Sequence, residues 1–427
     1  MRPGRLLWIL GLWGLLSGSA AGEDFDFEIP EEPAARLEVH GNLDGKWGLL
    51  QTRKGSPFYG LRFYDAPGTG DYLSQYRLDF YLNGDYRLKQ VGFFARTFTQ
   101  YAREEPIQIS FFELYGSLNL SPRLTVGLGK RRYTWGKGYA FNPAGHVNAE
   151  KDPENPDLAL AGRASAYFVY NRSFPSGWVQ NFSLTGVALP PAPDLLDRYA
   201  SASYTGGALK LYVLVRDIDI DLMVFRQKGE PQKYGLDFST NLKSNLEIHG
   251  EFNYIRDAKK YVLLDDRVTL RAVNGASYLL GTRYLAGSSN TTIIAEYYHH
   301  PPGLCRDEFR DAVDFLKRRL GSEDSALMQE AGPVVSTVLR SRTAMQDYLY
   351  MKVTQPEPFG WVYASVSAFA IYNVKDRSFT LSPQLAYKPY TNFEFLFWPT
   401  LFSGGGETEF GSRQFQGKVE IWARFYF

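Results

Sequence analysis

The sequence predicts an all-β protein: a transmembrane antiparallel β-barrel of about eighteen strands, with sixteen as the alternative count, and one long, partly helical loop. Three observations predict this fold. The final residues alternate apolar and polar side chains as far as the terminal Phe427. Residues 36–50 show the same alternation near the other end of the chain. Between the two ends, short and long connections alternate along the chain.

The final stretch, 414–427, has one apolar side and one polar side. Lys418, Glu420 and Arg424 lie on the polar side, whereas Phe425 lies on the apolar side. Period-two alternation places the two sets on opposite faces of a strand. In a soluble sandwich the apolar face would pack in a core, but in an outer-membrane barrel it would face lipid. A terminal Phe after such a strand resembles the closing strand of bacterial outer-membrane barrels, which implies recognition by the barrel assembly machinery.

Composition supports many short strands and gives no indication of bound cofactors. The 427 residues include 29 Tyr, 30 Phe and 40 Gly, and membrane barrels use such aromatics in their interfacial girdles. The mean hydropathy of −0.29 excludes a polytopic helical membrane protein. Cys305 is the single cysteine, so there is no disulfide framework and no cysteine-rich metal site. The near-neutral charge, +1, gives no hint of a nucleic-acid partner.

The N-terminus has the three parts of a secretory signal peptide, predicted over 1–22. Arg2 and Arg5 precede an apolar run that is too short to span a bilayer, and small residues follow it. Residues 23–35 are predicted to form a periplasmic segment, and 36–427 the barrel. Export together with a barrel implies the outer membrane of a Gram-negative bacterium, where lipid and lipopolysaccharide would surround the wall.

Alternating segments recur at regular intervals through the chain. Their predicted ranges are 36–50, 72–87, 90–102, 109–120, 124–133, 164–174, 178–189, 199–213, 218–227, 232–242, 245–256, 276–286, 290–300, 346–355, 360–373, 378–388, 392–402 and 414–427. The long connections all fall on one side of the barrel, at 52–71, 134–163, 257–275, 301–345 and 403–413. This asymmetry favours a barrel over a set of soluble sandwiches.

The connection at 301–345 is the partly helical loop. Phe309, Val313 and Leu316 recur at helical spacing among charged residues. It is either a lid or plug at the extracellular mouth, or a surface loop with its own small helix.

The connection at 134–163 is the candidate for a segment folded into the barrel. Gly136 and Gly138 permit the backbone to reverse sharply. Basic side chains beside aromatic ones would favour anionic or sugar-like solutes in a narrow lumen. The candidate constriction residues are Arg131, Arg132, Tyr133, Trp135, Lys137 and Asn142. The alternative is an external loop whose basic residues pair with the acids Asp152, Glu154 and Asp157.

These features resemble those of bacterial porins. In general porins the loop after the fifth strand folds into the lumen and forms the constriction. The whole chain is similar in size class to the 18-stranded OprD-type and alginate-export barrels, although no motif identifies one family. The resemblance implies a passive channel for small polar solutes rather than an enzyme.

Charged side chains on the polar sides of the strands are expected to face the lumen, because lipid-facing charges cost several kcal/mol at mid-depth. They serve either as solute contacts or as cross-strand pairs within the wall. These candidates are Arg77, Asp79, Arg96, Glu113, Asp237, Glu251, Arg283, Glu296, Lys418, Glu420 and Arg424.

Two further functions have weaker support. Asp152, Glu154 and Asp157 carry the oxygen ligands that Ca²⁺ prefers, but no metal site is predicted. His299–His300 at a strand end could serve a barrel hydrolase, yet no nucleophile-elbow or zinc-protease motif accompanies the pair. The alternatives to a passive channel are therefore a saccharide exporter or importer with a gating loop, and a barrel that supports an enzyme or adhesin. The solute and the oligomeric state stay open.

Overall fold

The computed structural model describes residues 35–65, 68–103, 105–158, 161–191, 205–322, 325–339 and 343–427. The predicted signal peptide and all but the last residue of the predicted periplasmic segment lie outside these ranges, and so do the side chains of 325–330.

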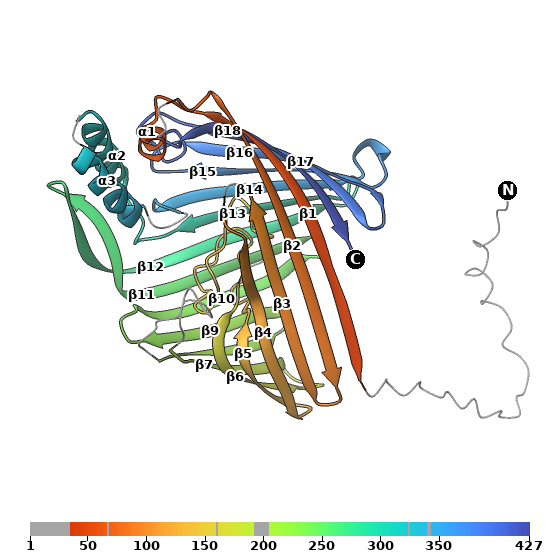
Figure 1. Cartoon of the computed structure of the whole chain (residues 1–427). Coiled ribbons are helices and arrows are strands. Elements are labelled where there is room, and N and C mark those ends of the chain that lie inside the picture. The colour runs from red at the N-terminus through yellow and green to blue at the C-terminus, as the bar shows by residue number, and fades with distance from the viewer. Residues whose placement is uncertain are drawn as a thin grey trace, which may run out of the picture. The chain divides into compact units, whose positions relative to one another are not determined.

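The described residues form one 18-stranded antiparallel sheet that closes on itself (Figure 1). Each strand pairs with the next in sequence, and β18 pairs with β1. The strands are β1 (Arg36–Thr52), β2 (Tyr72–Leu88), β3 (Val91–Ala102), β4 (Gln108–Ser121), β5 (Leu124–Arg131), β6 (Arg163–Ser173), β7 (Val179–Leu189), β8 (Gly206–Val215), β9 (Ile218–Gln227), β10 (Gln232–Lys243), β11 (Leu246–Leu264), β12 (Arg267–Ala286), β13 (Thr291–His299), β14 (Asp347–Pro356), β15 (Ala364–Asn373), β16 (Phe379–Tyr390), β17 (Phe393–Ser403) and β18 (Phe415–Tyr426). The predicted fold class is confirmed.

The closing seam follows from the alternation in β1 and β18. Asp44 lies opposite Arg424 in the register, and Lys46 lies opposite Trp422. On the inner face Arg424 donates two hydrogen bonds to Asp44, at 2.7 and 2.9 Å. On the outer face Phe425 is exposed, as the lipid-facing side of a barrel strand requires. The two chain ends of the barrel therefore meet through matched polar and apolar faces.

Connections at the two ends of the barrel differ as predicted. At the end where β1 starts, tight turns join the strands, such as the turn at Arg216 and Asp217, whose φ angles are +48° and +64°. At the opposite end the connections include 53–71, 132–162, 300–346 and 404–414. The long connections are therefore gathered at one end of the barrel.

One predicted loop is wrong. Residues 257–275 are not a loop, because β11 and β12 continue as a hairpin to a turn at Asp265–Asp266. Lys260 on this extension forms an ion pair with Glu308 of the long loop at 2.7 Å, and Val262 packs in a cluster with the same loop. Contacts with a segment far along the chain stabilise the extension, so the local sequence did not indicate it.

Smaller boundary differences have local causes. The strand predicted from 360 begins at Ala364, because Pro358–Gly360 forms a 3₁₀ turn, η1. The strand predicted from 199 is described only from Gly206 onward, since 199–204 lie outside the described residues.

The long loop carries two helices, α2 (Arg306–Leu320) and α3 (Ser325–Val338), and the connection between β1 and β2 carries α1 (Pro57–Arg62). The predicted helical face of α2 is buried: Phe309 and Val313 join a cluster with wall residues, and Leu316 packs against α3. Glu308 accepts a hydrogen bond from the Cys305 backbone N–H at 2.8 Å, which satisfies one free donor at the start of α2. None of the helices in the described ranges has the length and apolar character needed to span a membrane.

Candidate functional site: the lumen and its infolded segment

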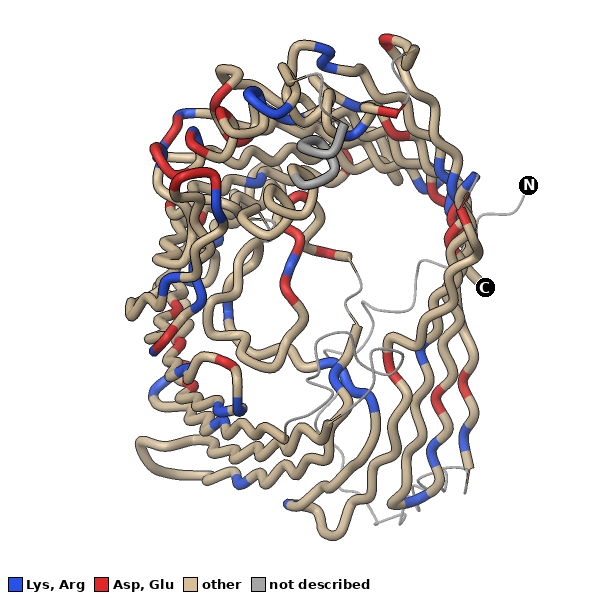
Figure 2. The backbone as a smooth tube through the Cα atoms, turned by 60° about the vertical axis from the view of Figure 1, so that its left-hand side comes forward, with Lys and Arg blue, Asp and Glu red and all other residues tan. Residues whose placement is uncertain are grey.

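The described residues of the connection from β5 to β6, 132–158 and 161–162, lie inside the ring of strands (Figure 2). We call this stretch the infolded segment. Its backbone and side chains make hydrogen bonds to inward-facing residues of β11, β13 and β14, on the wall opposite β5. These contacts cross the lumen, so the segment divides the interior.

Glu251 of β11 binds the first bend of the infolded segment through main-chain donors. Its Oε1 atom accepts hydrogen bonds from the N–H groups of Lys137 and Gly138 at 2.7 and 2.6 Å. Its Oε2 atom accepts one from Ala144 at 2.8 Å. The side chain is buried, so these charge-assisted hydrogen bonds replace its hydration.

Glu296 of β13 binds the next residues in the same way. It accepts hydrogen bonds from the N–H groups of Tyr139 and Ala140, the latter at 2.9 Å. The Nε2 atom of His249, on β11 two strands away, lies 3.1 Å from the same carboxylate. Two wall carboxylates thus hold five main-chain N–H groups of the infolded segment, from Lys137 to Ala144.

The bend that presents these donors depends on glycine and asparagine. Gly136 has a φ of +91°, and a Cβ atom there would lie 2.1 Å from Asn142 Oδ1. The side chains of Asn142 and Asn148 both donate hydrogen bonds to the carbonyl oxygen of Trp135, at 2.6 and 2.7 Å. Lys151 donates to the carbonyl oxygen of Gly138 at 2.5 Å. The sequence from Trp135 to Lys151 therefore folds upon itself through its own polar groups.

Lys137 reaches a different part of the wall. Its Nζ atom lies 3.1 Å from Asp221 of β9 and 3.9 Å from Asp237 of β10, which face each other in the sheet register. Lys210 of β8 also contacts Asp221 at 3.1 Å. Burial alone would lower the pKa of Lys137, but the two carboxylates raise it above the ordinary value of lysine. This lysine therefore stays charged between the two buried acids, and Lys210 supplies a second positive charge at Asp221.

Apolar packing fills the space between the infolded segment and the adjoining wall. Trp135 and Val147 pack with Tyr167 and Met223 of the wall. His146 is buried nearby, with its Nε2 atom 3.0 Å from Asn253 Oδ1. Burial, and then the charge of Lys233, lower the pKa of His146 to about 3, so it is neutral at physiological pH.

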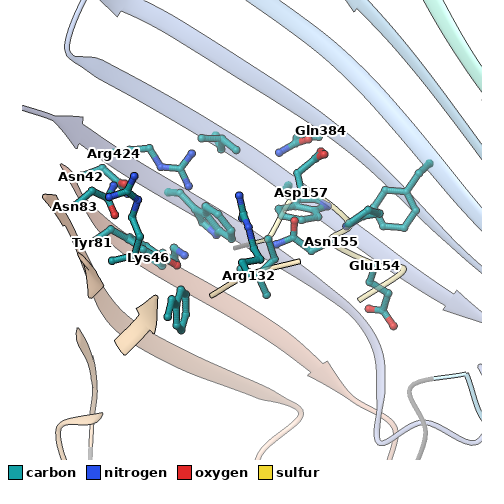
Figure 3. Close-up of a pocket in the computed structure, with 18 of the residues that line it drawn as sticks. Asn42, Lys46, Tyr81, Asn83, Arg132, Glu154, Asn155, Asp157, Gln384 and Arg424 are labelled. Atoms are coloured by element: carbon teal, nitrogen blue, oxygen red, sulfur yellow. The ribbon is translucent and has the colours of Figure 1, made fainter. Parts of the chain in front are cut away.

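On the other side of the infolded segment lies a cavity of about 480 Å³ (Figure 3). It is bounded by residues 154–158 of the segment, by strands β1 to β4 and by strands β14 to β18. Amide side chains, charged side chains and aromatic rings line it together. The lining comprises Asn42, Lys46, Tyr81, Asn83, Arg96, Thr97, Phe112, Glu113, Arg132, Glu154, Asn155, Pro156, Asp157, Leu158, Tyr350, Lys352, Phe369, Gln384, Leu396, Trp398, Trp422 and Arg424.

Most charged side chains in this lining form ion pairs. The shortest interactions are those of Lys46 with Asp79 at 2.7 Å, Arg424 with Asp44 at 2.7 Å, Lys352 with Asp157 at 3.1 Å, Glu154 with Arg413 at 2.5 Å, and Arg96 with Asp85. Lys46 also lies over the ring of Trp422, 3.8 Å from its centroid. Charge on the wall of the cavity is thus largely compensated locally.

The six candidate constriction residues separate into two groups. Arg132 lines the cavity, and Figure 3 shows it among the other lining side chains. The other five contact the wall or the segment itself. Arg131 lies 4.2 Å from the ring centroid of Tyr167, and Tyr133 is 2.8 Å from Ser165 Oγ. Trp135, Lys137 and Asn142 make the contacts described above.

The candidate wall residues all take part in contacts at the inner face of the barrel. Asp79, Asp237, Glu251 and Glu296 are buried, in the pairs and hydrogen bonds already described. The remaining contacts are Arg77 with Asp79 at 3.2 Å, Arg283 with Glu247 at 3.6 Å, Lys418 with Glu420 at 2.8 Å, Arg424 with Asp44, Arg96 with Asp85, and Glu113 with the Arg132 N–H.

The three acids considered as calcium ligands, Asp152, Glu154 and Asp157, each have a different partner. Glu154 pairs with Arg413 and Asp157 pairs with Lys352, while Asp152 Oδ1 accepts the N–H of Glu154 at 3.0 Å. Within the described part of the chain no cluster of three potential metal ligands occurs.

The histidines at the end of β13 make separate contacts. His299 Nδ1 lies 2.7 Å from Asp347, whereas His300 Nδ1 lies 3.4 Å from Ser277 Oγ. The carboxylate and the hydroxyl are on different imidazoles, so these described residues do not form a serine–histidine–acid relay.

Three charged residues of the inner wall were not among the candidates predicted from the sequence. Asp44, Lys46 and Asp221 are buried charged residues of the inner wall, at 0%, 7% and 1% exposure. Each sits on the polar side of an alternating strand, which is a signal that could have identified it. The pairing of Asp221 with Lys137 could not be found in this way, because it depends on where the infolded segment lies.

A closed antiparallel barrel with an infolded segment in a polar lumen has the architecture of a porin-like barrel. No protein-family model and no curated protein matches the sequence. Among solved structures, a mutant of the Rh. blastica porin aligns with a TM-score of 0.45 and 10% identity, covering 92% of this chain and 100% of that one. A triple mutant of the Rhodopseudomonas blastica porin aligns with a TM-score of 0.44 and 11% identity, with the same coverage. These similarities are too low to support any inference about function.

Proposed function

We propose that this protein is a passive diffusion channel for small polar solutes in the outer membrane of a Gram-negative bacterium. The observation that carries the proposal is the lumen cavity, which lies between the infolded segment and the wall and is lined by amides and charged groups. A closed barrel with an apolar outer face suits a bilayer, and a polar interior lets hydrated solutes pass.

Passive diffusion requires no catalytic groups at the site. In the described residues six of the eight charged side chains that line the cavity form ion pairs, and the two histidines near β13 make separate contacts. Discrimination would then depend on the width of the passage and on the charges at its surface. The mixture of amide, charged and aromatic side chains supports polar solutes, including saccharides and small anions, as the transported class.

Liposome swelling tests the proposal directly. Proteoliposomes with the refolded barrel are diluted into isotonic arabinose, glucose, sucrose or raffinose, and the fall in turbidity is followed. The swelling rate is expected to decrease steadily with solute size and to increase linearly with solute concentration. Heat-unfolded protein is the control.

Two results would contradict the proposal in different ways. Swelling no faster than in protein-free liposomes, for every solute, would exclude an open channel. Saturation with one solute and exclusion of others of the same size would favour a dedicated saccharide transporter instead.

A further inference from the structure

Eight charged side chains line the lumen cavity in the described residues, and two of them differ from the rest. The other six have partners of opposite charge within ion-pair distance, as described above. The guanidinium of Arg132 makes no ion pair or hydrogen bond with the described residues, and this side chain is exposed. The carboxylate of Glu113 accepts one hydrogen bond, from the Arg132 backbone N–H at 2.8 Å, whereas Arg96, its partner in the sheet register, forms its ion pair with Asp85.

These two residues lie at the same place in the passage. Glu113 belongs to β4 of the wall, and Arg132 is the first residue of the infolded segment after β5. The hydrogen bond between them fixes the start of the segment to the wall. The two side chains therefore present opposite charges to the same cavity, without forming a side-chain ion pair in which both would be neutralised.

We infer that Arg132 and Glu113 set the ion selectivity of the channel, and that they do so as an opposed pair. This inference rests on the proposed function. An ion pair inside the wall presents little field to a passing ion, because the two charges cancel over a short distance, whereas an uncompensated charge acts on it directly. With both residues present the two fields offset each other, and the passage discriminates weakly between anions and cations.

Lys137 and Arg131 do not share this role, although both are basic and belong to the same stretch of sequence. The ammonium group of Lys137 is held by Asp221 and Asp237, and Arg131 packs against Tyr167. Neither lines the cavity. Of the three basic residues grouped by the sequence, the structure assigns selectivity to Arg132.

The test is the zero-current potential across planar bilayers under a KCl gradient, measured for R132Q, E113Q and the double variant. R132Q removes a cation and is expected to raise the potassium-to-chloride permeability ratio about sevenfold, since one charge at roughly 7 Å in water contributes about RT for each ion, with opposite signs for potassium and chloride. E113Q keeps an acceptor oxygen for the Arg132 N–H and is expected to lower the ratio by a similar factor. The double variant should return close to the original ratio.

K54Q is the matched control. It removes the same charge from the exposed connection between β1 and β2, where Lys54 pairs with Asp71 at 2.7 Å, and the ratio should not change. Each variant is first checked for discrete current steps, so that a misfolded barrel is not scored as a change in selectivity.

Unchanged permeability ratios in both single variants would overturn the inference, and so would shifts of the two ratios in the same direction.

If R132Q does not fold, an Arg132→Cys variant in a Cys305→Ser background supplies the same comparison, using thiol reagents of positive and negative charge. The positive reagent should restore the original ratio, and equal ratios with both reagents would overturn the inference. A conducting barrel with unchanged selectivity contradicts this inference alone, whereas a silent wild-type barrel contradicts the proposed function as well.

Discussion

At the scale of single residues, Lys137 shows how a side chain of the infolded segment completes the barrel wall. Asp221 and Asp237 lie directly opposite each other on β9 and β10, and like charges in such positions repel. Lys137 contacts both carboxylates, and Lys210 supplies a second positive charge at Asp221. Removing one partner of a buried ion pair typically costs about 3–5 kcal/mol, because the remaining charge stays buried without compensation. The wall and the segment are thus mutually dependent at this point.

Glu409, in the loop between β17 and β18, is a second buried charge with a structural role. Its carboxylate accepts hydrogen bonds from Tyr348 at 2.9 Å and from Asn373 at 2.6 Å. Burial raises its pKa to about 7, although the charge of Arg413 and these hydrogen bonds act in the opposite direction. The folded loop therefore retains a proton that the unfolded loop would lose near its ordinary value of 4.5.

A pH dependence of local stability follows. Because the folded-state pKa lies above the unfolded one, the stability of the 404–414 loop should fall as pH rises from about 4.5 to about 7, and should change little above that. The decrease is at most about 3 kcal/mol. Hydrogen exchange of the loop amides, corrected for the intrinsic rate, should show less protection at pH 8 than at pH 5.

Glu409→Gln should remove most of this dependence, because the substituted amide does not titrate. Glu407→Gln is the matched control: Glu407 is in the same loop but fully exposed, and its pKa is lowered by the hydrogen bond from Lys317 rather than raised. Equal protection of the wild-type loop at both pH values would contradict the interpretation.

At the scale of elements, β11 and β13 position the infolded segment. Glu251 and Glu296 stand on the inner face of these strands and accept five N–H groups from one short stretch. Backbone donors are independent of side-chain identity, so the sequence of this stretch is restricted by the bend, through Gly136, Gly138 and Asn142, rather than by the carboxylates. The attachment requires carboxylates, because only a carboxylate offers acceptors without any competing donor.

Glu251→Gln and Glu296→Gln should therefore loosen the segment while the barrel stays closed. The substituted amide would direct an NH₂ group at main-chain N–H donors, and each lost charge-assisted hydrogen bond is worth about 1.5–3 kcal/mol. Single-channel recordings should show larger and noisier open currents. Heat-modifiable mobility on gels should be unchanged, as for a folded barrel.

Glu247→Gln provides the control for this experiment. Glu247 lies on the same face of β11 as Glu251, but it contacts Arg283 and His249 of the wall rather than the infolded segment. Currents of the Glu247→Gln variant should match the wild type. Wild-type currents in both the Glu251 and the Glu296 variants would show that these carboxylates do not position the segment.

At the scale of the whole molecule, the barrel could be predicted because its pattern is local. Alternation along β18 distinguishes the lipid-facing Phe425 from the inward-facing Arg424, and the turns and loops identify the two ends of the barrel. The extension of β11 and β12 could not be predicted in this way. Its stability depends on Glu308, which is more than forty residues away from Lys260 in the chain.

The candidate site was predictable only in part, for the same physical reason. The bend at Gly136 and Gly138 is a local property, and the sequence indicated it. The distinction between Arg132 and Lys137 is not local, because it depends on which wall residues each side chain meets. Two basic residues five positions apart are equivalent in the sequence and different in the folded barrel.

The central claim is that the barrel is a channel narrowed by the infolded segment, and single-channel conductance tests it most directly. Wild-type protein in planar bilayers is compared with a variant in which residues 135–151 are replaced by a short Gly-Ser linker. We predict small, discrete current steps for the wild type and steps several times larger for the variant, since the segment no longer occupies the lumen. A silent wild type, or steps of equal size in the two proteins, would contradict the account.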